Sequence, residues 1–228
     1  MYVRAGQPQE ALRTFQDYAR RFPKPAGQLI DAEQRLAELY AQQNNSERQQ
    51  YWLQQIIETD KDGGAERSDH TRLLAGRAAL TLADARYRAF ADIKLTHPLK
   101  NSLKGKKKAM EEALAAYRAA GDYGIAEITT ASTYHAAQIY SDLGKAIMDS
   151  ERPKGLSGLE LEQYNVLLEE QAYPFEEQAI ALYEANAHRA AENVYDDWVK
   201  KSYAALSKLL PARYGKTEKG DAYVDALY

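Results

Sequence analysis

The chain has 228 residues, of which 45% are hydrophobic and 28% charged, and it carries a formal net charge of −3 without a single cysteine. The charge disfavours a general nucleic-acid-binding surface, which needs a strongly basic balance, and the lack of cysteine excludes disulfides, thiolate nucleophiles and cysteine-ligated metals. No apolar run approaches the roughly 20 residues of a membrane-spanning helix. We therefore expect a globular protein with neither a nucleic-acid partner nor a membrane span.

The first half of the chain has the pattern of amphipathic helices. Apolar residues at helical spacing predict helices over about 8–22, 28–43 and 46–60. Ser46, followed three residues later by Gln49, has the pattern of a capping box at the start of the third helix. Ser68 is expected to cap a fourth helix that runs to about Thr96, because neither glycine nor proline follows Gly76 until that point.

The second half predicts longer helices after a polar connection over 98–108. A helix then ends near Ala120, and the next covers about 125–149 with a regular three-four apolar spacing. Ser157 and Glu160 form a second capping-box pattern, which opens a helix to about 173. Pro174 either kinks this helix or starts another, and the stretch 175–210 predicts one long helix or two with a break near Asn193.

Residues near the N-terminus follow the order Tyr2-x3-Gly6-x4-Ala11-x3-Phe15-x7-Pro23. This order resembles the tetratricopeptide repeat, in which a turn glycine joins two helices, a small residue lets them approach, an aromatic fills the space between pairs and a proline ends the second helix.

A second copy in the same phase, Leu36-Ala37-x2-Tyr40-x3-Asn44-x4-Gln49-x3-Leu53, is degenerate. Gln49 stands where a small residue is expected, and Lys61 stands where a proline is expected. The clear resemblance covers about residues 1–61.

The resemblance implies an all-α fold of antiparallel helix pairs forming a tetratricopeptide-like right-handed solenoid with long C-terminal helices. The expected organisation is degenerate repeats over 1–97, a lysine-rich connection over 98–108, a helical part over 109–212 packed on the repeats and a tail over 213–228. Tyr2 belongs late in the first helix of a repeat, so the phase predicts a C-terminal piece of a longer array. The stretch 148–177 resembles the C-terminal region of large bacterial cell-envelope tetratricopeptide proteins, which favours a periplasmic or envelope location over a cytoplasmic one.

The candidate partner-binding residues lie on the inward face of the second helix. In a repeat array this face would present Asp31, Gln34, Glu38 and Gln42 to a ligand. An acidic, amide-lined surface repels anionic peptides, so a neutral or basic protein or peptide is the expected partner.

A candidate basic patch comprises Lys100, Lys104, Lys106, Lys107 and Lys108, whereas the stretch 160–184 carries seven glutamates and no Lys or Arg. Each is by default a solvated surface. The two could instead meet, within the chain or between chains, and the lysines could bind a phosphate or an anionic lipid head group.

Signatures of catalysis are missing from the sequence. There is no His-Glu-x-x-His, no Gly-x-Ser-x-Gly and no phosphate-binding glycine loop, and Glu184 with His188 supplies only two of the ligands that a metal site needs. We therefore expect no catalytic residue, no metal and no cofactor, and a non-enzymatic function.

The leading hypothesis is a protein–protein interaction scaffold that binds its partner along a helical-repeat surface. The alternative is a structural subunit of a bacterial envelope assembly that packs through its long C-terminal helices, and a third hypothesis is an enzyme with an unrecognised site. An open apolar or aromatic groove would favour the first, a large apolar patch on a long helix the second, and convergent titratable groups in a closed pocket the third.

Overall fold

The computed structural model describes residues 8–216, and within them the chain forms helices and no strands. Helix accounts for 82% of these residues, so the predicted all-α class is confirmed. The elements are α1 (Pro8–Arg21), α2 (Ala26–Gln42), α3 (Ser46–Asp62), η1 (Gly64–Glu66), α4 (Asp69–Ala91), α5 (Leu99–Gly121), α6 (Ala126–Met148), α7 (Gly158–His188), η2 (Arg189–Glu192), α8 (Asp197–Leu209) and α9 (Pro211–Tyr214). Tyr2, Gly6 and most of the predicted tail lie outside the described residues.

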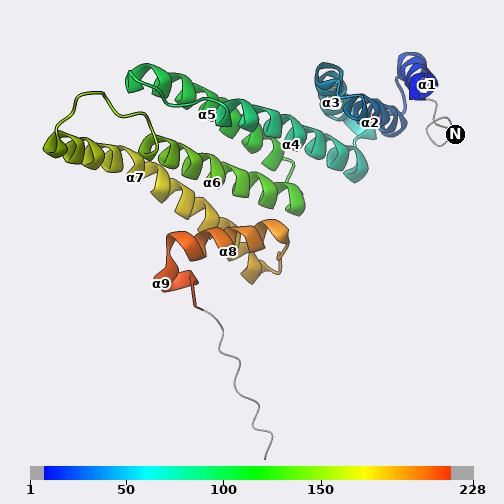
Figure 1. Ribbon diagram of the computed structural model, residues 1–228. Helices are drawn as coiled ribbons and strands as arrows, with labels where there is room; N and C mark the ends of the chain where they lie inside the picture. The colour runs from blue at the N-terminus through cyan, green and yellow to red at the C-terminus, as the bar shows by residue number, and fades with distance from the viewer. Residues whose placement is uncertain (1–7, 217–228) are drawn as a thin grey trace, which may run out of the picture.

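Each α-helix from α1 to α9 packs against the next along the chain, so the molecule extends as a stack of helices (Figure 1). In addition, α2 contacts α4, α4 contacts α6, and α6 contacts α8. These four helices therefore form one continuous layer, against which α1, α3, α5 and α7 pack. We call the exposed side of α2, α4, α6 and α8 the even-helix face, because residues far apart in the sequence meet there.

Helix α4 joins the two ends of the stack through its buried side chains. Its first half packs with α2 and α3, and its second half packs with α5, α6 and α7. The residues of α4 that make these contacts are Ala75, Ala78, Ala79, Ala83 and Phe90. Four of them are alanines, whose small side chains let the neighbouring helices approach closely.

Side-chain caps set the predicted starts of α4 and α7. Ser68 and Thr71 form a reciprocal capping box at α4, and Ser157 and Glu160 form one at α7, as the sequence patterns predict. The prediction for α3 was wrong by one residue. Asn45 is the cap there, because its side-chain oxygen accepts a hydrogen bond from the backbone N–H of Arg48 at 3.1 Å.

The predicted lysine-rich connection over 98–108 is helical from Leu99 onward, and α4 ends at Ala91 rather than near Thr96. Lysine is a good helix former, so a polar composition alone does not separate a loop from an exposed helix face. Here α5 is held by its apolar residues, among which Met110 and Ala113 are buried in the core.

Helix α7 continues through Pro174 and ends at His188, and the break predicted near Asn193 is present. Asn193 adopts a left-handed conformation with φ 63°, which asparagine tolerates better than most residues. At Pro174 the helix lies against Gly144 of α6, where an added Cβ would stand 3.5 Å from the carbonyl oxygen of Ala172. Close packing on α6 therefore offsets the hydrogen bond that proline removes from the helix.

Candidate binding groove

A groove of about 700 Å³ lies between α1, α2 and α4 at the start of the even-helix face. Its apolar lining includes Phe15, Tyr18 and Leu74. Its polar lining includes Asp31, Gln34, Arg35, Glu38, His70 and Arg77. Ligand pockets have volumes of about 300–1,000 Å³, so the groove is large enough for a few side chains of a peptide.

Three of the four predicted partner-binding residues line this groove. Asp31, Gln34 and Glu38 share one side of α2 and face the space between α1 and α4. Gln42 is exposed at the last turn of α2 and does not line the groove. The helical spacing of the sequence thus places the first three residues together, but the groove ends before the last turn.

The electrostatic character of the groove differs from the acidic surface that the sequence predicts. His70 Nε2 lies 2.8 Å from Asp31 Oδ1, and Arg35 Nη1 lies 2.6 Å from Glu38 Oε2. Gln34 donates a further hydrogen bond to the second oxygen of Glu38 at 2.9 Å. Both carboxylates already have partners, and these pairs form before any ligand binds.

Arg77 is a second guanidinium in the groove, and Glu127 of α6 holds it by an ion pair of 2.7 Å. The lining therefore combines two carboxylates with two guanidiniums, and one of these guanidiniums is already paired with a carboxylate of α6. Sequence reasoning missed His70 and Arg77 because they belong to α4, whose position opposite α2 depends on packing. Their sequence signal is the helical spacing of His70, Leu74 and Arg77, which puts these residues on one face of α4.

Behind the groove, α2 buries a carboxyl group against α3. Glu33 is only 4% exposed, and its Oε1 accepts a hydrogen bond from Thr59 at 3.1 Å. Its Oε2 is buried and has no hydrogen-bond partner among the described residues. Desolvation raises the pKa of Glu33 to about 7, with the Thr59 hydrogen bond lowering it and the charge of Glu58 raising it by smaller amounts.

A cluster of aromatic rings lies between α5, α6 and α8. His135 of α6 stacks on Tyr117 of α5 at 5.1 Å and contacts Trp198 of α8 at 4.9 Å, measured between ring centroids. Tyr134 packs on Trp198 at 5.4 Å. Burial lowers the pKa of His135, so the ring is held neutral among these aromatic neighbours.

Trp198 itself is only half-buried, although it has the largest side chain of α8. The Lys201 ammonium lies 3.9 Å from the centre of its ring and covers one face. The fully buried residues of α8 are Val199, Ser202 and Leu206. Helix α8 docks on the stack through these residues, among which Leu206 packs with Ala137 of α6 and Ala179 of α7.

Two tyrosine–aspartate hydrogen bonds connect the helices around the aromatic cluster. The Tyr87 hydroxyl donates to Asp142 at 2.6 Å, and the Tyr117 hydroxyl donates to Asp84 at 2.6 Å. Desolvation, followed by these carboxylates, raises the pKa of both phenols well above the usual value. The phenols therefore remain protonated donors, and their geometry fixes α4 against α5 and α6.

The predicted basic patch lies on the first half of α5, not on a loop. Lys100, Lys104, Lys107 and Lys108 border a hollow of about 500 Å³ together with Leu103 and Glu111. Lys106 does not belong to this surface, because it is only 3% exposed and points into the core. The sequence could not separate Lys106 from its neighbours, since all five lysines look alike in composition.

The Lys106 side chain caps the C-terminal end of α4. Its ammonium donates hydrogen bonds to the carbonyl oxygens of Phe90 at 2.9 Å and Ile93 at 2.8 Å, and it lies 4.3 Å from the centre of the Phe90 ring. Burial lowers the pKa of this ammonium group. Helix-terminal carbonyls need such donors, and a buried lysine supplies them here.

We expect Lys106→Met to lower the free energy of unfolding by about 1.5–3 kcal/mol, the usual range for hydrogen bonds to a charged group. Methionine keeps the aliphatic stem and removes both hydrogen bonds. Urea denaturation of the variant measures the effect, and Lys104→Met on the exposed side of α5 is the matched control. Equal stabilities of the two variants would contradict a capping role for Lys106.

Glu184, considered with His188 as a possible metal ligand in the sequence, is paired with residues of α9. Glu184 Oε1 accepts hydrogen bonds from Arg213 at 2.6 Å and from Tyr214 at 3.0 Å, so it is held by α9 rather than by His188. No group of three or more potential metal ligands occurs in residues 8–216. None of the helices in that range is long and apolar enough to cross a membrane.

Fold and groove together place the chain in a broad class: an all-helical protein with a peptide-sized groove between its first, second and fourth helices. Comparison with family models, curated proteins and solved structures gives no significant match. The groove and the surfaces of this chain are therefore the features that bear on its function.

Proposed function

We propose that this protein is an interaction scaffold, and that it binds a protein or peptide partner in the groove between α1, α2 and α4. The observation that carries the proposal is the convergence of Asp31, Gln34 and Glu38 with apolar residues of α1 and α4 around one groove. Helices that are already packed supply its walls, so binding costs little ordering of the scaffold. The proposal includes no catalytic step and no cofactor.

The lining favours a neutral ligand over a basic one. Arg35 pairs with Glu38 and His70 pairs with Asp31, which removes part of the electrostatic reason to expect a basic partner. A peptide with apolar and amide side chains would contact Phe15 and Leu74 and would share hydrogen bonds with Gln34. A strongly acidic or strongly basic peptide would have to break the existing ion pairs without a net gain.

A peptide-display selection on the full chain tests this proposal. Peptides that the selection enriches are measured by fluorescence anisotropy against the wild type, Gln34→Arg and Gln42→Arg. The arginine at position 34 fills the groove, and we expect at least about a tenfold rise in Kd, or 1.4 kcal/mol. Gln42→Arg lies on the same helix outside the groove and is expected to bind normally.

Unchanged melting temperatures of both variants would show that the weaker peptide binding of Gln34→Arg comes from the change in the groove and not from unfolding. Equal Kd values for the two variants would contradict the groove as the site. Tight, salt-insensitive binding of an acidic peptide would contradict the proposed ligand class.

The tetratricopeptide-like solenoid and an envelope or periplasmic location are parts of the same proposal. Two observations on packing support the solenoid: helices pack as consecutive neighbours, and every second helix contacts the next of its layer. Ala11 is buried and Phe15 packs beside it, as the repeat pattern requires. The location has no support beyond the resemblance of the stretch 148–177.

A second candidate function is the structural subunit that packs through its long C-terminal helices. The specific observation in its favour is the concentration of exposed large apolar side chains on the first half of α7. The groove and this helix lie on different parts of the stack, so the two functions are compatible.

A further inference from the structure

The first half of α7 exposes a stripe of apolar side chains. Leu159 is 67% exposed, Val166 52% and Tyr173 60%, and Leu167 is exposed beside them. The first three are spaced seven residues apart, so they lie along one side of the helix, as at the seam between two packed helices. We call these four residues the α7 stripe.

The α7 stripe points away from the core of its own chain. Leu168 and Ala172 lie on the opposite side of α7 and pack in the core with Met110 and Ala113 of α5. The stripe is therefore not covered by α5 of the same chain. Soluble monomers rarely expose contiguous apolar patches, which mark contact surfaces when they occur.

Charge narrows the choice of partner. Glutamates flank the α7 stripe, and α7 contains no lysine or arginine from Gly158 to His188. Glu162 and Glu170 are exposed next to the stripe. A surface that covers it must offer apolar contact together with positive charge.

The hollow on α5 has this composition. Leu103 forms its apolar floor, and Lys100, Lys104, Lys107 and Lys108 surround it. Lys100 and Lys104 form no ion pair with any residue in the range 8–216, and Lys108 reaches Glu112 only at 3.9 Å. The basic hollow on α5 thus complements the apolar α7 stripe and the glutamates that flank it.

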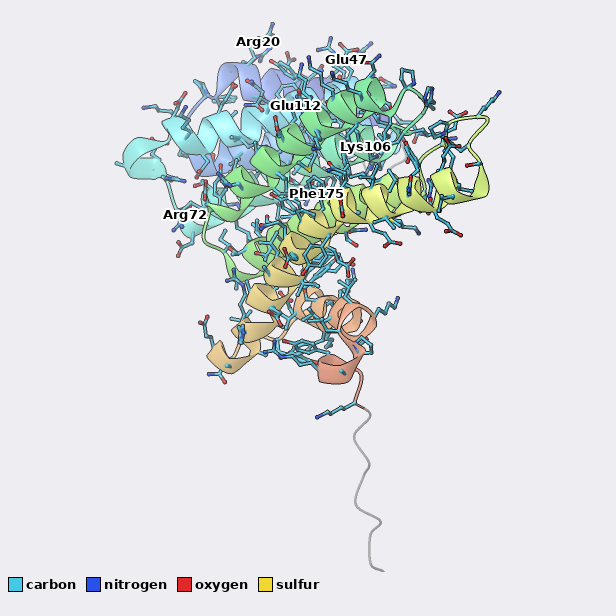
Figure 2. All side chains as sticks on the ribbon, turned by 90° about the vertical axis from the view of Figure 1, so that its left-hand side faces the viewer. Arg20, Glu47, Arg72, Lys106, Glu112 and Phe175 are labelled. Atoms are coloured by element: carbon cyan, nitrogen blue, oxygen red, sulfur yellow. The ribbon has the colours of Figure 1, made fainter. Side chains whose placement is uncertain are left out.

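The two surfaces adjoin in one molecule. Helices α5 and α7 begin at the same end of the stack (Figure 1), and the Lys107 ammonium lies 5.2 Å from the centre of the Phe175 ring. Figure 2 looks at this end and labels Lys106 on α5 and Phe175 on α7. A two-fold axis near this end can therefore place each stripe on the hollow of the other chain.

We propose that the chain forms a symmetric dimer, in which the α7 stripe of each protomer packs on the lysine-lined hollow of α5 of its partner. The occupant of each surface is thus a second copy of this chain. The stripe extends from Leu159 to Tyr173, about 21 Å of helix at 1.5 Å per residue step, and two-fold symmetry uses this contact twice.

Analytical ultracentrifugation of the full chain tests the dimer. We expect a mass twice the 25.7 kDa of one chain at micromolar concentrations and low salt. Added salt is expected to shift the equilibrium toward the monomer, because the contact pairs exposed charges. A monomer under all these conditions would overturn the proposal.

Reversing the charges around the α5 hollow or beside the α7 stripe tests whether these two surfaces form the dimer contact. Lys104→Glu with Lys108→Glu makes both surfaces acidic, and Glu162→Lys with Glu170→Lys makes both basic, so each variant alone is expected to be monomeric. An equimolar mixture of the two variants restores both contacts and is expected to dimerise. All four positions are exposed, so circular dichroism should show an unchanged fold.

Lys24→Glu with Lys61→Glu, at exposed positions near the other end of the stack, is the matched control and is expected to dimerise like the wild type. A dimer that either reversal leaves intact, or a mixture that stays monomeric, would overturn the assignment of the two faces. The groove is not altered by these changes, so failure of the dimer and failure of peptide binding are separate results.

Discussion

Replacing Leu206 with alanine is expected to lower the free energy of unfolding by about 2–5 kcal/mol, the usual range for a fully buried leucine. Leu206 is 0% exposed and packs against Ala137 of α6 and against Ala179 and Tyr183 of α7. It is the largest buried side chain of α8. Its truncation leaves a cavity at the contact that docks α8 on the stack.

Trp198→Ala provides the comparison. A loss of about 3–5 kcal/mol is expected only for a tryptophan in a packed core, and Trp198 is half-buried under Lys201. We therefore expect a smaller loss for Trp198→Ala than for Leu206→Ala. Denaturant unfolding of both variants, with the exposed Lys208→Ala as control, measures the order, and a larger effect at Trp198 would contradict Leu206 as the principal anchor.

The second large effect concerns Glu33→Gln and depends on pH. The pKa of Glu33 is about 7 in the folded protein against 4.5 for the free side chain. Between these two values the folded state holds more protons than the unfolded state, so the free energy of unfolding falls as pH rises. The fall amounts to about 3 kcal/mol, at about 1.4 kcal/mol per pKa unit, and is complete above about pH 7.

Glutamine keeps the shape of Glu33 and its hydrogen bond with Thr59 but does not titrate. The variant is therefore expected to lack this fall and to be more stable than the wild type at pH 8, with little difference at pH 4.5. Urea denaturation at both pH values tests this, and Glu47→Gln, at an exposed position of α3, controls for the loss of one negative charge. Parallel pH profiles of the wild type and Glu33→Gln would contradict an ionised carboxyl buried at this position.

Local patterns in the sequence determined the all-α class and most helix boundaries. The capping residues Ser68 and Ser157 act on backbone groups within three residues of themselves, so their effect is visible in the sequence alone. The apolar spacing of α6 likewise predicts the buried Ile128, Leu143 and Ile147.

The tertiary structure alone decided the composition of the groove. The spacing on α2 places Asp31, Gln34 and Glu38 together, but the partner of Asp31 comes from α4. His70 and Arg77 reach the groove because α4 packs beside α2, and no local pattern encodes that contact. The spacing in the sequence therefore predicts which residues of α2 share the groove, whereas their partners on α4 follow only from the packing of the helices.

The same reason explains the lysines, Trp198 and Pro174. Lys106 is buried because carbonyl groups at the end of α4 lie within its reach, whereas Lys104, two residues earlier, faces solvent. Trp198 is half-exposed because α8 turns Val199 and Leu206 toward the core. Helix α7 continues past Pro174 where it packs along α6. Residue type and spacing determine which helices form, and contacts between distant helices decide which of their faces are buried.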